Sequence, residues 1–237
     1  MTFLSLIILS LLASTSNWAQ EHDYQEIDTN LVSDWIEKYP RPYAGVYLFG
    51  DSESESSLVI LYAKSTLVVQ ISWGEWNEEA NEFYTHYETL TNVTINNGQF
   101  KSDQYAGSFV NYLDEETKRK GLRINNPWTA GINDGVWELG LKSMHPFQCK
   151  GKYPKATTNY LYQSNLNKTS RQELKIMRNE IYARYGYTFR TGGEMDKYFR
   201  ATDWYKPQHK NVDAYITSIE KKNIALIQAT EKLAASD

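Results

Sequence analysis

Apolar and polar positions alternate in short runs over the first half of the chain. These runs are rich in β-branched and aromatic residues and are separated by turn-forming sequences, a pattern typical of half-buried strands. No long helical pattern lies between them, which favours antiparallel over parallel pairing. The pattern therefore predicts an antiparallel sandwich or a small open barrel. The predicted strands are 44–49, 58–62, 67–73, 84–93, 107–113, 120–124 and 136–142.

Turn signals support this interpretation. Asn96–Gly98 and residues 134–135 are predicted as hairpin turns, because Gly accepts the positive φ that these turns require. The charged residues 115–119 are predicted as a further hairpin end. Ahead of the strands, residues 30–39 are predicted as a short helix that ends at Pro40.

The period of the apolar positions becomes helical near the C-terminus. Residues 170–184 are predicted as a helix, because Ser170 and Glu173 have the spacing of a capping box and an apolar stripe follows. Gly186 is placed to end this helix. Further helices are predicted at 194–200 and 214–233.

The change of period predicts an α+β protein. The predicted parts are an antiparallel β domain at 30–147, a linker at 148–168 and a helical domain at 169–237. Charge divides in the same way. Residues 20–147 hold 9 Lys and Arg against 20 Asp and Glu, whereas residues 148–237 hold 16 against 9. The two halves therefore either attract each other or face different partners.

The first 19 residues contain no Asp, Glu, Lys or Arg, and Phe3–Ala13 is an apolar run too short to span a membrane as a helix. This pattern predicts a secretory signal peptide at 1–19 that is cleaved after Ala19. Because the apolar run is so short, we expect no transmembrane segment. No cysteine lies near the cleavage site, so we also expect no lipid anchor. The expected location is secreted or periplasmic.

The single cysteine, Cys149, excludes an internal disulfide. We interpret it as a bystander thiol in the linker and not as a nucleophile. An intermolecular disulfide stays open as an alternative.

The most specific motif is Tyr182–Tyr187, with the sequence Tyr-Ala-Arg-Tyr-Gly-Tyr, followed by Asp203–Pro207. Together with Arg178–Ile181 and Lys222–Ile224, it resembles the YARHG domain, a small module of exported bacterial proteins. The resemblance covers roughly residues 169–237. It implies an exported location and a fold, because the family has no established reaction or ligand.

The family pattern has a histidine where this chain has Tyr185. A histidine base or metal ligand is therefore not expected at this position. We expect the Tyr185 ring to lie over the end of the helix and to make one polar contact.

Basic and aromatic residues are interleaved in the helical domain, a combination that binds anionic or sugar-bearing polymers by charge and stacking. The candidate binding residues are Arg184, Arg190, Lys197, Trp204, Tyr205 and Lys206. The alternative, which the small size of the domain favours, is that the aromatics form its core and that Arg184 bonds to backbone carbonyls or pairs with Glu180 or Asp203.

Two substitutions test this packing. Trp204 is predicted to be buried, so Trp204→Ala should cost about 3 to 5 kcal/mol. Gly186→Val should be similarly harmful if Gly186 has a positive φ.

Acidic clusters in the β domain suggest two other sites. A calcium site at Asp51, Glu53 and Glu55 lacks the central Gly and the closing Glu of a helix-loop-helix site, so a solvated hairpin tip is favoured. A glycosidase site is disfavoured because carboxylates so close in sequence are usually solvated. That second cluster comprises Trp73, Glu75, Trp76, Glu78, Glu79 and Glu82.

Motifs of other enzyme classes are incomplete. Gly107-Ser108 lacks the glycines of a nucleophile elbow, and Thr191–Gly193 lacks the Lys and Ser or Thr of a phosphate loop. The histidines are too scattered for a helical zinc pair. They are His22, His86, His145 and His209.

These observations favour an exported, non-enzymatic protein without cofactor or metal that docks onto a cell-envelope polymer or envelope protein. Nucleic acid is disfavoured, because the whole chain has a net charge of −4. One alternative is a β domain that binds a small ligand, with the helical domain as a cap. A less favoured one is a cell-wall hydrolase accessory.

Overall fold

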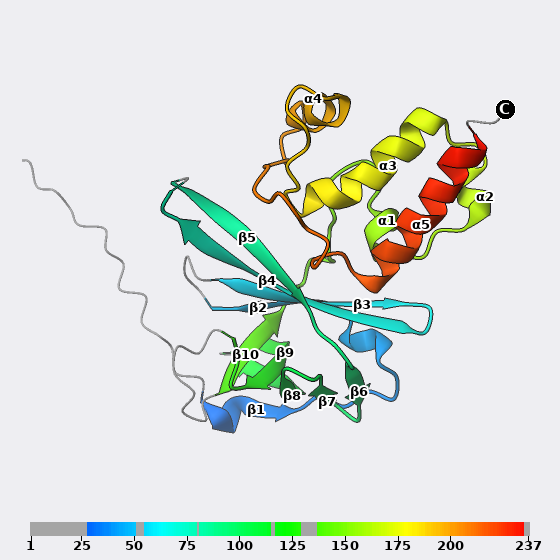
Figure 1. Cartoon of the computed structure of the whole chain (residues 1–237). Coiled ribbons are helices and arrows are strands. Elements are labelled where there is room, and N and C mark those ends of the chain that lie inside the picture. The colour runs from blue at the N-terminus through cyan, green and yellow to red at the C-terminus, as the bar shows by residue number, and fades with distance from the viewer. Residues whose placement is uncertain (1–27, 51–54, 80, 115–116, 129–136, 235–237) are drawn as a thin grey trace, which may run out of the picture.

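A computed structural model describes residues 28–50, 55–79, 81–114, 117–128 and 137–234. A curved β sheet is followed by a helical module that lies against one side of it (Figure 1). The predicted signal peptide, Asp51 with Glu53, and the turn at 134–135 lie outside the described residues.

The sheet is antiparallel throughout and has ten strands in the described part of the chain. Its order is β5-β4-β3-β2-β10-β9-β8-β7-β6, with β1 paired to β8, so the sheet is open and not closed into a barrel. The predicted α+β class is confirmed, and each predicted strand is present. The bounds are β1 Val32–Asp34, β2 Gly45–Phe49, β3 Ser56–Ala63, β4 Thr66–Asn77, β5 Glu82–Thr89, β6 Thr94–Asn96, β7 Gln99–Lys101, β8 Ala106–Asp114, β9 Thr117–Asn125 and β10 Trp137–Lys142.

The core of the β domain lies between two halves of this sheet, one formed by β2–β5 and the other by β6–β10. The Tyr43 ring stacks on Phe109 of β8 with centroids 4.1 Å apart, which joins the two halves. Asn97 and Gly98 both have positive φ and form the predicted turn between β6 and β7. The other fully buried large side chains of this core are Tyr47, Phe49, Leu58, Ile60, Ile71, Phe100, Leu122 and Ile124.

The helix predicted at 30–39 is wrong. A single 3-10 turn, η1 (Thr29–Leu31), leads into β1, and a second one, η2 (Arg41–Tyr43), precedes β2. The backbone N–H of Trp35 donates to the Phe109 carbonyl at 3.0 Å, and the indole is buried in the core. Pairing with β8 and burial of this ring therefore outweigh the local helical pattern.

The helical module lies against the outer face of β3 and β4. Ile219 packs on Ala63 and Val68, and Tyr160 Oη donates to Thr66 Oγ1 at 2.8 Å. Contact with this second layer explains why Leu58–Ala63 of β3 is a continuous apolar run, where a strand with one wet face would alternate.

The helical module contains α1 (Lys155–Thr158), α2 (Gln163–Leu166), α3 (Arg171–Arg184), α4 (Glu194–Arg200) and α5 (Ser218–Leu233). The N-cap half of the capping box predicted for α3 is present, since Ser170 Oγ accepts from the Glu173 N–H. α5 begins later than predicted, because Thr217 and Glu220 form a capping box there. The helices α3 and α5 pack through a core that includes Leu174, Met177, Ile181 and Ile227.

The segment predicted as a linker takes part in this core. Ala156 of α1 and Leu166 of α2 are buried in it. The Asn223 side chain of α5 donates to the carbonyls of Ala156 and Asn159, each at 2.7 Å, and accepts from the Leu161 N–H at 2.9 Å. Residues 155–166 are thus packed and hydrogen-bonded as part of the helical module.

A second cluster around the fully buried Phe199 joins α4 to α3. Trp204 packs on Phe199 with ring centroids 6.0 Å apart, but its side chain is only partly buried. The predicted full burial of Trp204 is therefore wrong, because one side of the indole faces a cavity. The expected cost of Trp204→Ala falls below the roughly 3 to 5 kcal/mol of a fully buried ring.

Candidate functional site

The motif around Tyr185 lies between the helical module and the sheet. Tyr185 follows the last residue of α3, is 5% exposed and makes an edge contact with Tyr87 of β5 at 4.8 Å. Its hydroxyl lies 2.8 Å from Glu220 Oε2 and 3.2 Å from Gln70 Oε1. The ring thus has two polar neighbours where the sequence predicted one, and it joins α3, α5 and β4.

Glu220 is the centre of this polar contact. Its carboxyl group is fully buried and accepts from Thr157 Oγ1 at 2.8 Å, from the Thr217 N–H at 2.9 Å and from Thr217 Oγ1 at 2.8 Å. Burial raises the pKa of Glu220, although these hydrogen bonds oppose the shift. The acid is thus a satisfied structural group at the interface.

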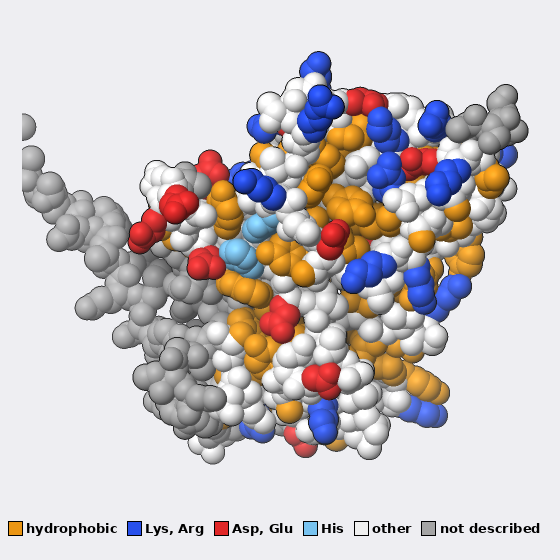
Figure 2. Space-filling model, viewed as in Figure 1, with side chains coloured by type: hydrophobic (Ala, Val, Ile, Leu, Met, Phe, Trp, Pro, Cys, Tyr) orange, Lys and Arg blue, Asp and Glu red, His pale blue; other side chains and the backbone are white. Residues whose placement is uncertain are grey.

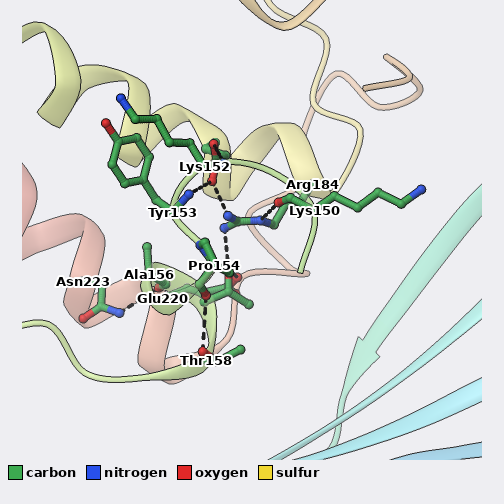
Figure 3. A network of polar contacts seen from close by, with 11 residues as sticks. Lys150, Lys152, Tyr153, Pro154, Ala156, Thr158, Arg184, Glu220 and Asn223 are labelled. Atoms are coloured by element: carbon green, nitrogen blue, oxygen red, sulfur yellow. Dashed lines mark hydrogen bonds and ion pairs between the residues drawn. The ribbon is translucent and has the colours of Figure 1, made fainter. Parts of the chain in front are cut away.

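Arg184 is held by a second network (Figure 3). Its guanidinium pairs with Glu180, and the two side chains are 9% and 2% exposed. It also donates to the Lys150 carbonyl at 2.7 Å and to Thr157 Oγ1 at 2.8 Å. The structural interpretation of Arg184, with a carbonyl and Glu180 as partners, matches this geometry. Its charge is compensated inside the protein.

The side chains of Gln208 and His209 attach the helical module to the free edge of β5. Gln208 accepts from the Thr85 N–H at 3.1 Å and donates to the Phe83 carbonyl at 2.7 Å. His209 Nε2 lies 2.8 Å from the Thr85 carbonyl. An end strand presents unpaired backbone groups, and these contacts cover several of them.

Two of the four histidines meet at this edge. The His86 and His209 rings have centroids 5.4 Å apart at the junction of β5 and the helical module. His86 also lies 3.3 Å from Glu75 Oε2 and 3.3 Å from the Tyr215 hydroxyl. Within the described residues, no group of three or more potential ligands has a metal-binding arrangement.

A cavity of about 410 Å³ lies between the sheet and the helical module. Its floor includes Val59, Leu61 and Val68 from the outer face of the sheet, and Trp204 contributes to its wall. The helical module covers this cavity, whereas the alternative drawn from the sequence, a β domain that binds a small ligand with the helical domain as a cap, stays a prediction. The cavity is on the outer face of the sheet, whereas the space between the sheet halves holds the aromatic core.

Cys149 lines the same cavity and is a free thiol. Burial raises the pKa of this thiol to about 11, so the neutral form dominates at neutral pH. A nucleophilic role is therefore disfavoured.

We expect alkylation of Cys149 by iodoacetamide to accelerate mainly between about pH 10 and 11, above the roughly 8.5 of an unperturbed thiol. Mass spectrometry of the native protein over a pH series measures this rate, and the urea-unfolded protein is the control. A midpoint near pH 8.5 in the native protein would show that the thiol is not shielded.

The candidate binding residues fall into three environments. Arg190, Lys197 and Lys206 are exposed, whereas Tyr205 is buried and donates to the Tyr187 carbonyl at 2.7 Å. Trp204 and Arg184 are partly buried. The structure therefore does not gather all six side chains on one surface.

The described members of the two acidic clusters of the β domain lie at the surface or are partly buried. Glu55 and Glu78 are exposed, and Trp76 is half exposed near the tip of the β4–β5 hairpin. Trp73 and Trp76 are three residues apart on β4, so strand alternation places them on opposite faces. They cannot form one sugar platform.

Residues 151–232 match the family model of the YARHG domain. No curated protein and no solved structure matches the chain significantly. No helix in the described residues has the length and apolar character needed to cross a membrane. The C-terminal module is a YARHG domain, a type of domain found in exported bacterial proteins.

Proposed function

We propose that this is a secreted or periplasmic, non-enzymatic protein that binds an anionic polymer of the cell envelope through the cationic surface of its YARHG domain. The family and the apolar N-terminal run support export. The observation that carries the binding proposal is that most carboxylates of the domain are paired or buried within it.

Most carboxylates of the helical module are neutralised internally. Five form ion pairs with Lys or Arg of the same module, and Glu220 is buried. The pairs are Glu173–Lys152, Glu180–Arg184, Glu194–Lys175, Asp196–Arg200 and Glu231–Arg178. The surplus cations are therefore left at the surface, where Figure 2 shows them spread over the helical module. An anionic polymer fits such a surface.

Three exposed cations of this surface are chosen for the test: Arg190, Lys197 and Lys210. No ion pair within the described residues involves them. Stacking contributes little to the proposed contact, because Tyr205 is buried and Trp204 faces the cavity. Binding by charge at an exposed surface weakens as salt rises, since the screening length falls from roughly 10 Å at 0.1 M to 3 Å at 1 M.

The experiment measures sedimentation of the protein from Gln20 onward with insoluble peptidoglycan as salt is raised. We expect binding at low salt that is lost toward 1 M, and at least about tenfold weaker binding after Arg190→Glu, Lys197→Glu and Lys210→Glu in one chain. The matched control reverses three exposed lysines of the β domain and changes the total charge equally. Its substitutions are Lys38→Glu, Lys101→Glu and Lys118→Glu.

Equal losses in the two triple variants would point to net charge alone and would contradict a specific cationic surface. No sedimentation of the unmodified protein at low salt would reject peptidoglycan as the polymer.

A further inference from the structure

We propose that the cavity between the sheet and the YARHG domain binds a small amphipathic anion, with an apolar body on the sheet and a carboxylate or phosphate head at the cavity rim. This inference does not depend on binding of an envelope polymer, because it concerns a different surface.

The floor of the cavity suits an apolar body. Val59 and Leu61 of β3 and Val68 of β4 point from the outer face of the sheet toward the helical module. The Ser57 and Ser72 hydroxyls, which also line the cavity, lie 2.8 Å apart and hydrogen-bond to each other. Contact with an apolar group would therefore remove apolar surface from water while leaving these hydroxyls paired.

The polar groups deeper in the cavity already have protein partners. Gln70 Nε2 donates to the Tyr215 carbonyl at 2.7 Å and lies 3.0 Å from Thr89 Oγ1. Glu220 is hydrogen-bonded, and the Arg184 charge is balanced by Glu180. A ligand rich in hydroxyl or amide groups would find few free partners there, which disfavours a sugar or a peptide.

Two cations of the cavity lining are not balanced in this way. Lys150 and Lys206 are both exposed, and no ion pair within the described part of the chain involves either. Figure 3 shows the Lys150 side chain extending away from the Arg184 network. An anionic head at the rim would be attracted by both ammonium groups while remaining partly hydrated.

The size of the cavity limits the ligand to a small molecule. Its volume of about 410 Å³ lies within the roughly 300 to 1,000 Å³ of small-molecule sites. A single medium-length alkyl chain with one anionic group fits this description.

The test adds decanoate or decyl phosphate to the protein and measures its melting temperature and the alkylation rate of Cys149 at pH 9. A bound ligand stabilises the folded state by mass action and covers the thiol in the cavity. We expect both anions to raise the melting temperature and to slow alkylation at least threefold. Decanol and acetate, which each lack one half of the proposed ligand, should do neither at equal concentration.

Paired variants locate the head group. Lys150→Gln with Lys206→Gln should weaken decanoate binding at least tenfold, whereas Lys168→Gln with Lys221→Gln, exposed lysines outside the cavity, should leave it unchanged. Equal protection of Cys149 by decanol, decanoate binding that both pairs leave intact, or no protection by either anion would overturn the proposal.

A further arm uses vesicles of phosphatidylglycerol to identify the source of the ligand. Cosedimentation with the vesicles and slowed Cys149 alkylation would support a membrane lipid. Protection by decanoate without cosedimentation would support a free amphiphile.

Discussion

Replacing Glu180 with alanine should lower the free energy of unfolding by about 3 to 5 kcal/mol, because it breaks a buried ion pair and leaves the Arg184 cation without its partner. Two backbone groups also lose their acceptor. The N–H groups of Lys152 and Tyr153 donate to the Glu180 carboxylate at 2.8 and 2.7 Å. Urea unfolding followed by circular dichroism measures the effect.

Glu173 provides the matched control on the same helix. It also pairs with a lysine, at 2.9 Å, but its side chain is 42% exposed. An exposed ion pair contributes little to stability, so Glu173→Ala should leave the urea midpoint almost unchanged.

The double variant Glu180→Met with Arg184→Met separates the stranded charge from the lost packing. It should recover much of the stability lost in Glu180→Ala, because no unpaired charge remains in it. If Glu180→Ala and Glu173→Ala have the same urea midpoint, the Glu180–Arg184 pair does not hold the segment around residue 152 in place.

The elements with local chemical signals could be predicted from the sequence. α3 begins after Ser170 and ends just before Gly186, as these two residues indicate, and α4 has the predicted bounds 194–200. The longer strands follow from their β-branched and aromatic residues. β1, β6 and β7 have three residues each, too few to establish a period. The predicted helix at 30–39 failed because the contact of Trp35 with β8 is not local.

The candidate cavity depends on contacts between distant segments, which periodicity does not reveal. Gln70 reaches the carbonyl of a residue 145 positions later, and Thr85 contacts a side chain 123 positions later. One signal was available: the apolar run Leu58–Ala63 of β3 lacks the alternation of a strand with one wet face, which indicates a second covering layer. The helical period places Asn223 on the inward side of α5, but its partners could not be predicted, because they lie in a segment that reads as a linker.

The YARHG motif has a structural role that its position at the end of α3 explains. Gly186 reverses the chain with φ +70°, and its carbonyl accepts from the N–H groups of Gln208 and His209 at 2.7 and 2.9 Å. Those two residues contact the edge of β5 through their side chains. The geometry of this glycine thus positions the part of the helical module that meets the sheet.

Gly186→Val should therefore destabilise the protein for two reasons. A left-handed backbone costs a branched residue about 1 to 3 kcal/mol. Its Cβ would also lie only 3.0 Å from the Lys206 carbonyl oxygen and 3.3 Å from Gln208 Cβ, and displacing a packed segment costs about 1 to 3 kcal/mol more. We expect a total loss of about 2 to 6 kcal/mol in urea unfolding.

Gly192→Val is the matched control, because Gly192 has φ +71° but no atom within 4 Å of the added Cβ. It should show only the backbone cost. The difference between the two variants then measures how tightly the 206–208 segment packs on the end of α3. Equal stabilities would mean that this segment yields without cost and that the motif does not fix the helical module against the sheet. Gly186→Val is also tested by alkylation of Cys149. A larger loss of stability in Gly186→Val, together with an alkylation midpoint that falls toward about pH 8.5, would show that the cavity depends on this turn.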